Sequence, residues 1–72
     1  LDSERAREDL ERFLDQAFAA GARTVRVVHG HGTGTLRRMV DEVCRQHPAV
    51  LSFRHPPQRR GGSGVTEVDL AI

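Results

Sequence analysis

Apolar residues in the first third of the chain recur at three- and four-residue steps, the spacing that gathers side chains on one face of an α-helix. A helix is therefore predicted over Ser3 to Ala20, where Asp2 or Ser3 can cap its free amides and Gly21 can end it in a left-handed conformation. Its other face is charged and is expected in solvent. The predicted buried positions are Ala6, Leu10, Phe13, Leu14, Ala17 and Phe18.

A second helical pattern follows a glycine-rich segment in the middle of the chain. This helix is predicted to begin at the glycine-rich turn and to end near Gln46, because Pro48 disfavours helical geometry at His47. The apolar positions that share its buried face are Leu36, Met39, Val40, Val43 and Cys44.

Residues 24–28, 50–54 and 64–72 are short, rich in β-branched residues and largely alternating, which predicts three strands. Between the last two strands, residues 56–63 are rich in proline, glycine and arginine, so a mobile, basic hairpin loop too polar to pack is expected. The predicted order is helix, strand, helix, strand, strand, an α/β arrangement. The positions expected to face the core are Leu51 and Phe53 in the second strand, and Thr66, Val68, Leu70 and Ile72 in the third.

A helix that covers a sheet normally arrives from a preceding strand, so a first strand is expected upstream of Leu1. The 72 residues form one domain at most, and 38% hydrophobic residues leave too little apolar sequence for a membrane span. The single cysteine, Cys44, cannot form an internal disulfide, which favours a cytoplasmic setting.

All 11 basic residues are arginines, whose planar guanidinium groups bind phosphate oxygens through two donors at once. The net charge of +1 conceals a strong segregation. Residues 1–21 carry three arginines and six acidic residues, residues 22–64 carry eight and two, and residues 65–72 carry none and two. The middle segment is thus where an anionic partner is expected to bind.

Residues 29–37, His-Gly-His-Gly-Thr-Gly-Thr-Leu-Arg, carry the most specific chemistry. Alternating glycines allow close approach to the backbone, and the amides that open the second helix favour an anion, so a phosphate site is predicted. The alternative is that the glycines only form a tight strand-to-helix turn. His29 and His31 add groups that exchange protons near neutral pH, as phosphodiester cleavage requires. They could also share a divalent ion, although the sequence offers no complete ligand set and no structural metal site is predicted.

This motif, the strand that ends in Ser-Phe-Arg and the strand Gly-Val-Thr-Glu-Val-Asp-Leu at 64–70 resemble the Smr domain, the small MutS-related module, over residues 1–72. They are most similar to the C-terminal Smr domain of bacterial MutS2 proteins. A second family motif, Leu-Asp-Leu-Arg/His-Gly, has no counterpart here. Leu1-Asp2 matches only its first two letters, and Leu1 aligns with the residue after the motif.

The resemblance implies a two-layer α/β sandwich, β-α-β-α-β-β in the complete domain. It implies an endonuclease that binds and nicks DNA, preferring branched or non-B structures, within a MutS2 protein active in DNA repair and in suppression of homologous recombination. Other members act on RNA, including messenger RNA at stalled ribosomes, in ribosome quality control. Within MutS2 the module follows an ATPase dimer, so ATP belongs to another domain of a homodimeric parent. No cofactor intrinsic to the module is implied, and Mg²⁺ or Mn²⁺ is a candidate aid to cleavage.

His29 is the predicted general acid or base, and Arg37 the predicted group that neutralises developing charge. The predicted nucleic-acid-binding residues are Gly30, His31, Gly32, Thr33, Gly34, Arg26, Arg38, Arg59 and Arg60. Each arginine has the alternative of lying in solvent or pairing with Asp41, Glu42, Glu67 or Asp69, and Arg54 is expected to pair with the acidic last strand.

All three aromatic residues, Phe13, Phe18 and Phe53, fall on predicted core faces, which would leave none to stack on bases. Binding is therefore expected to follow the shape and backbone of the nucleic acid and to weaken steeply with salt. The competing hypotheses are a non-catalytic module that docks on DNA, RNA or the ribosome through the same site, and a protein-binding module that uses the acidic first helix.

Overall fold

The computed structural model describes residues 3–32 and 34–72, and its elements follow the predicted order. Their bounds are α1 Ser3–Ala19, β1 Thr24–Val28, α2 Thr35–Gln46, β2 Val50–Arg54 and β3 Val65–Leu70. Gly21 is left-handed (φ 80°) just after α1, as predicted. Leu1 and the expected capping residue Asp2 lie outside the described residues.

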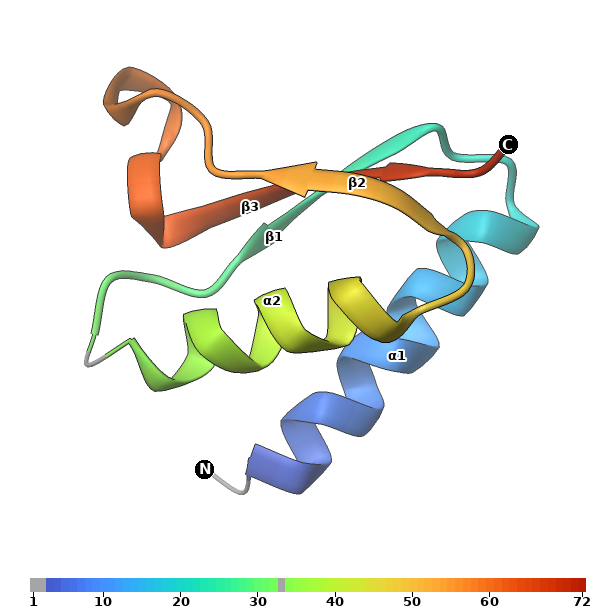
Figure 1. Ribbon diagram of the computed structural model, residues 1–72, viewed down its shortest axis with the longest axis horizontal. Helices are drawn as coiled ribbons and strands as arrows, with labels where there is room; N and C mark the ends of the chain where they lie inside the picture. The colour runs from blue at the N-terminus through green and yellow to red at the C-terminus, as the bar shows by residue number, and fades with distance from the viewer. Residues whose placement is uncertain (1–2, 33) are drawn as a thin grey trace.

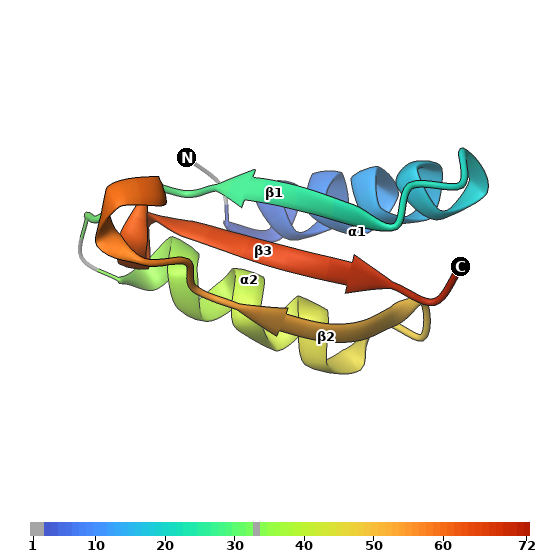
Figure 2. The same cartoon turned by 90° about the horizontal axis from the view of Figure 1, so that it is seen from above.

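The three strands form one sheet in the order β1-β3-β2, and β3 runs antiparallel to both neighbours. Both helices lie against the same face of this sheet (Figures 1 and 2). The predicted α/β class and two-layer arrangement are therefore confirmed. Within the described residues β1 is paired along one edge only, and the strand expected upstream of Leu1 is not among them.

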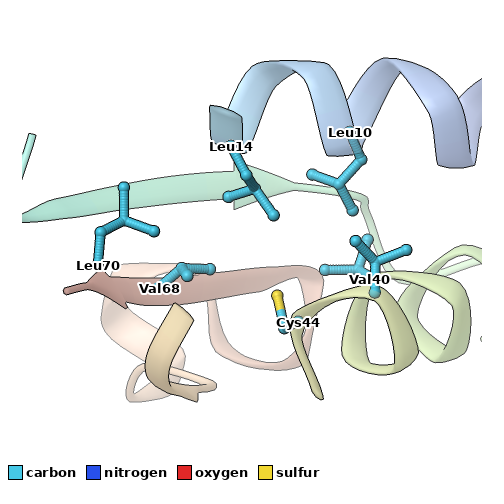
Figure 3. Packing of buried hydrophobic residues seen from close by; sticks show 7 residues of the cluster. Leu10, Leu14, Val40, Cys44, Val68 and Leu70 are labelled. Atoms are coloured by element: carbon cyan, nitrogen blue, oxygen red, sulfur yellow. The ribbon is translucent and has the colours of Figure 1, made fainter. Parts of the chain in front are cut away.

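The core lies between the helices and the sheet, where both helical stripes meet the central strand (Figure 3). Thr66, Val68 and Leu70 of β3 alternate toward this side, as predicted. The buried apolar residues of the cluster are Leu10 and Leu14 of α1, Val40, Val43 and Cys44 of α2, and Val68 and Leu70 of β3. Burial of these side chains is the main force that holds the helices on the sheet.

Two predicted core positions on α1 are wrong. Phe13 and Phe18 are 43% and 42% exposed, because α1 buries only the narrow row of Leu10, Leu14 and Ala17. The inference that no aromatic ring is left exposed is therefore also wrong. Both rings belong to the C-terminal half of α1, which runs away from the glycine-rich turn (Figure 1).

Three predictions for the second half of the chain are also corrected. Leu51 is 71% exposed, because an irregularity in the register between Val50 and Ser52 breaks the alternation and leaves Val50 and Phe53 to face the core. Ile72 is exposed beyond the end of β3. The segment between β2 and β3, expected to be too polar to pack, forms the 3-10 turns Gln58–Arg60 and Gly62–Gly64 and buries Pro56.

Asp69 joins all three strands on the face of the sheet opposite the helices. Its carboxylate accepts hydrogen bonds from Thr24 Oγ1 at 3.0 Å, Ser52 Oγ at 3.0 Å and Arg54 Nη1 at 2.7 Å. Arg54 Nε also pairs with Glu67 Oε1 at 3.2 Å, which confirms the predicted pairing of Arg54 with the last strand. Hydrogen bonds, first from Arg54 and then from Thr24 and Ser52, hold the pKa of Asp69 below its ordinary value of 3.8.

The Asp69 contacts predict an acid-sensitive contribution to stability. A lowered pKa means that folding favours the ionised carboxylate, so this contribution is present above pH 3.8 and is lost as the pH falls through the folded-state pKa. We expect Asp69→Asn to lower the urea midpoint of unfolding at pH 7 and to differ little from the parent at pH 2. An equal difference at both pH values would contradict the assignment.

Cys44 provides a probe of the core. Burial, followed by the negative charge of Asp41, raises the pKa of its thiol from 9.0 to about 11. The reactive thiolate is therefore scarce in the folded chain at pH 8 and is also inaccessible. We expect a thiol-specific disulfide reagent to label Cys44 at pH 8 only in denaturant, and rapid labelling without denaturant would show that the helices do not cover it.

Candidate functional site

The glycine-rich segment after β1 and the two 3-10 turns before β3 lie at the same end of the molecule (Figures 1 and 2). Backbone hydrogen bonds join them, because the amides of His29 and Gly30 both donate to the carbonyl of Gly64, at 3.0 and 2.9 Å. The ring of His31 lies over Gly64 so closely that a Cβ there would stand 2.7 Å from its Cε1. Gly64 therefore allows the two segments to meet.

A small cavity of about 190 Å³ opens at this junction. It brings both predicted catalytic residues, His29 and Arg37, to the same place as the loop glycines and the first turn of α2. The residues that line it are His29, Gly30, Gly32, Gly34, Thr35, Leu36 and Arg37. Thr33, which was predicted to contact nucleic acid, lies outside the described residues.

The cavity is bounded by the N-terminus of α2. Gly34 is the N-cap residue, with a left-handed φ of 89° and no side-chain cap. The first amides of a helix have no acceptor inside it and carry partial positive charge, so this end favours an anion. No carbonyl of the described residues accepts a hydrogen bond from the backbone amide of Gly32. The amide of Gly30, a predicted nucleic-acid-binding residue, is not available to a phosphate, because it already donates to the carbonyl of Gly64.

His29 closes the other side of the cavity, and both of its ring nitrogens have partners. Nδ1 lies 3.0 Å from the carbonyl oxygen of Gly30, and Nε2 lies 2.9 Å from Oγ1 of Thr66. A carbonyl can only accept, so in the neutral ring Nδ1 carries the proton and Nε2 accepts from the Thr66 hydroxyl. The Nδ1 contact is exposed and the Nε2 contact is partly buried.

His55 extends this network toward Arg37. Its Nδ1 lies 2.9 Å from the carbonyl oxygen of Val65 and 3.4 Å from Oγ1 of Thr66. Arg37 Nε donates to Nε2 of His55 at 3.2 Å. The rings of His29 and His55 stand edge to face, with centroids 6.1 Å apart. One chain of polar contacts therefore links the two predicted catalytic residues through Thr66 and His55.

Neither linking residue stands out in the sequence. His55 lies outside the glycine-rich motif, and Thr66 is predicted only to face the core. The one signal for Thr66 is a hydroxyl at a predicted core-facing position. A buried polar group normally has a hydrogen-bond partner, so a partner for this hydroxyl could have been expected. Its pairing with Val27, two residues before His29, depends on the order of strands in the sheet.

Of the remaining predicted arginines, three lie at the cavity end and the fourth makes a contact within the fold. Arg38 borders a neighbouring hollow together with Gly34, Arg37 and Asp41. Arg59 and Arg60 are exposed on the first 3-10 turn, at the same end of the molecule. Arg26 lies on β1 and donates through Nη2 to the carbonyl oxygen of Arg60 at 2.7 Å, so it anchors the turn.

Two kinds of feature are absent from the described residues. Residues 3–32 and 34–72 contain no group of three histidine, cysteine or acidic side chains arranged to hold a metal ion. In the same part of the chain, no helix is long and apolar enough to cross a membrane.

A family model for the Smr domain matches residues 1–71. The chain belongs to the Smr domain family. It is similar to proteins named endonuclease MutS2, with 47% identity over 72 residues in Thermomicrobium roseum and 49% over 61 residues in Geobacillus kaustophilus. The alignments cover 100% and 85% of this Smr domain but only 9% and 8% of those proteins.

Two solved structures share the fold of this Smr domain. The crystal structure of the Smr domain of Thermus thermophilus MutS2 has 39% sequence identity and a TM-score of 0.94, covering 100% of this chain and 90% of that one. YdaL, a stand-alone small MutS-related protein from Escherichia coli, has 28% identity and a TM-score of 0.78, with 85% and 51% coverage.

The hydrogen bonds of the site predict specific histidine tautomers. At pH 8 we expect the rings of His29 and His55 to carry their proton on Nδ1. His47 is an internal control: its Nδ1 accepts from the amide of Ala49, and its Nε2 lies 2.7 Å from Asp15 Oδ1, so it should be protonated on Nε2. Imidazole ¹⁵N chemical shifts distinguish the two forms, and finding all three rings protonated on Nε2 would contradict the network.

Proposed function

We propose that this Smr domain is a nucleic-acid-binding endonuclease module that cleaves a phosphodiester bond held between His29 and Arg37. The observation that carries the proposal is that one cavity is lined by an imidazole, a guanidinium and the uncapped N-terminus of α2. The name endonuclease, borne by the similar MutS2 proteins, supports the same class of reaction.

The cavity suits a phosphate group. The amide of Gly32 and the N-terminus of α2, where Gly34 is the N-cap, offer partial positive charge to its oxygens. Arg37 uses Nε toward His55, which leaves the two Nη groups to bind phosphate. Arg38, Arg59 and Arg60 would contact phosphates on either side. Such contacts are made to the sugar–phosphate backbone of the nucleic acid and do not read its base sequence. They suit recognition of nucleic-acid shape, as in branched or non-B DNA.

Hydrolysis requires a new bond from water to phosphorus, loss of the bond to the leaving oxygen, and a proton for that oxygen. When its ring is doubly protonated, His29 can give the proton from Nδ1, which lies on the more exposed side, and is left neutral with its remaining proton on Nε2; solvent later restores the lost proton. The Thr66 hydroxyl can either donate to Nε2 or accept from it, so it holds the ring in each protonation state. Meanwhile Arg37 and the amides of the turn stabilise the charge on the phosphate oxygens, and the proton lost by the attacking water passes to solvent.

A second candidate is a docking module that binds DNA, RNA or the ribosome at the same surface without cleaving. One observation favours it: both ring nitrogens of His29 already have partners inside the protein. General acid catalysis requires Nδ1 to exchange the carbonyl of Gly30 for a substrate oxygen.

The proposal predicts separate effects for two substitutions. We expect His29→Ala to reduce the nicking rate by about 10²- to 10⁴-fold while leaving binding nearly unchanged, because it removes only proton transfer. Arg37→Ala should weaken binding as well and reduce the salt slope of the affinity by about one. The assay uses end-labelled branched DNA, linear duplex and structured RNA, each with Mg²⁺, with Mn²⁺ and with a chelator.

Arg45→Ala is the matched control, since it removes the same charge from the last turn of the same helix, away from the cavity. It should retain both activities. Binding by every variant without cleavage of any substrate would support the docking module instead. Equal effects of the Arg37 and Arg45 substitutions would contradict a specific phosphate site.

A further inference from the structure

Asp41 carries an unsatisfied oxygen beside the site. Within the described part of the chain, Oδ1 of Asp41 is buried and has no hydrogen-bond partner. It lies 3.4 Å from Nε2 of His55, and the two side chains are only 18% and 23% exposed. A buried carboxylate oxygen without a donor is unfavourable, so this arrangement calls for a functional explanation.

We explain it by the fact that His55 Nε2 can make only one hydrogen bond at a time. The Val65 carbonyl keeps a proton on Nδ1 in every state, because a carbonyl can only accept. In the neutral ring Nε2 is therefore a lone pair, which accepts from Arg37 Nε at 3.2 Å. In the protonated ring Nε2 becomes a donor, which suits Asp41 Oδ1 and excludes Arg37. The two contacts are mutually exclusive.

We propose that His55 is a positioning residue for Arg37, which it holds when neutral and releases to bind Asp41 when protonated. This inference rests on the proposed role of Arg37 in binding phosphate. A guanidinium anchored through Nε has its two Nη groups oriented before the ligand arrives, which saves the entropy of ordering a long side chain. Its release removes that advantage.

The groups that face His55 come from three elements, and some favour a protonated imidazole while others disfavour it. Arg37 and Asp41 extend from α2, one disfavouring and one favouring a positive imidazole. His29, at the end of β1, adds a second imidazole that would repel a charged His55 only when it is itself protonated. β3 contributes only the Val65 carbonyl and the Thr66 hydroxyl. Release of Arg37 is therefore expected when acidification places a proton on His55 Nε2.

The first test uses nuclear magnetic resonance on the free protein and needs no activity. At pH 8 the Arg37 Nε–H should exchange with solvent at least about tenfold more slowly than that of exposed Arg45, and this protection should vanish as His55 is protonated. Asp41→Ala should move the loss of protection to lower pH, because it removes the competing acceptor. Exchange of Arg37 Nε–H as fast as that of Arg45 at pH 8 would overturn the proposal.

The second test is a double-mutant cycle on binding of a short labelled DNA duplex, with Arg37→Ala and His55→Phe alone and together. At pH 8 the two substitutions should be non-additive by about three- to tenfold, the value of one hydrogen bond, and at pH 5.5 they should be additive. The cycle cancels the general gain of positive charge at low pH. Equal coupling at both pH values, or none at pH 8, would overturn the proposal.

His55→Gln tests whether the effect of His55→Phe comes from loss of the hydrogen-bond acceptor or only from altered packing. A glutamine oxygen can accept from Arg37 Nε but does not titrate, so this variant should retain the coupling to Arg37 at both pH values. Loss of coupling in the glutamine variant at pH 8 would count against the proposal. Slow exchange of Arg37 Nε–H together with no binding of any nucleic acid would support the role of His55 and reject the proposed function of the site.

Discussion

The pairing of β3 between β1 and β2 is the interaction on which the other features depend. Because side chains alternate along a strand, β3 presents Val68 and Leu70 to the helices and Asp69 to the opposite face. Its first residues serve the site: the Val65 carbonyl orients His55, and the Thr66 hydroxyl meets the ring of His29. A single strand therefore links the stability of the domain to the geometry of its cavity.

The local parts of the fold could be predicted from the sequence, because each is encoded by its own periodicity. The helix Thr35–Gln46 begins at glycines and ends before Pro48, and the strand Thr24–Val28 has a clear alternating pattern. The errors at Phe13 and Leu51 have tertiary causes. The first depends on how much of α1 the sheet can cover, and the second on an irregular register that no local pattern announces.

The site was predictable to a similar extent. The motif around His29 and Arg37 is continuous in sequence, so its chemistry could be inferred and the cavity does unite these residues. Thr66 and His55 come from 37 and 26 positions later. Thr66 reaches His29 through the pairing of β3 with β1, and His55 is brought there because β2 pairs with β3. The engaged amide of Gly30 likewise depends on a distant carbonyl, that of Gly64.

Contacts with residues distant in the sequence also separate the arginines into two groups. The sequence shows an excess of positive charge in the middle of the chain, but it does not show which arginines make contacts within the fold and which lie near the cavity. Arg26 and Arg54 are used within the fold, the first on a carbonyl of the 3-10 turn and the second on two carboxylates of β3. Arg37, Arg38, Arg59 and Arg60 gather around the cavity end instead.

The central position of β3 has a consequence for how the chain acquires its structure. β3 follows both of its neighbours in sequence, so during synthesis β1 and β2 leave the ribosome with no partner between them. Two short strands that cannot pair hold little structure of their own. The three-stranded sheet therefore forms only after translation has passed Leu70. Until then the apolar side chains of α1 and α2 have no sheet to cover them and are accessible to chaperones and proteases.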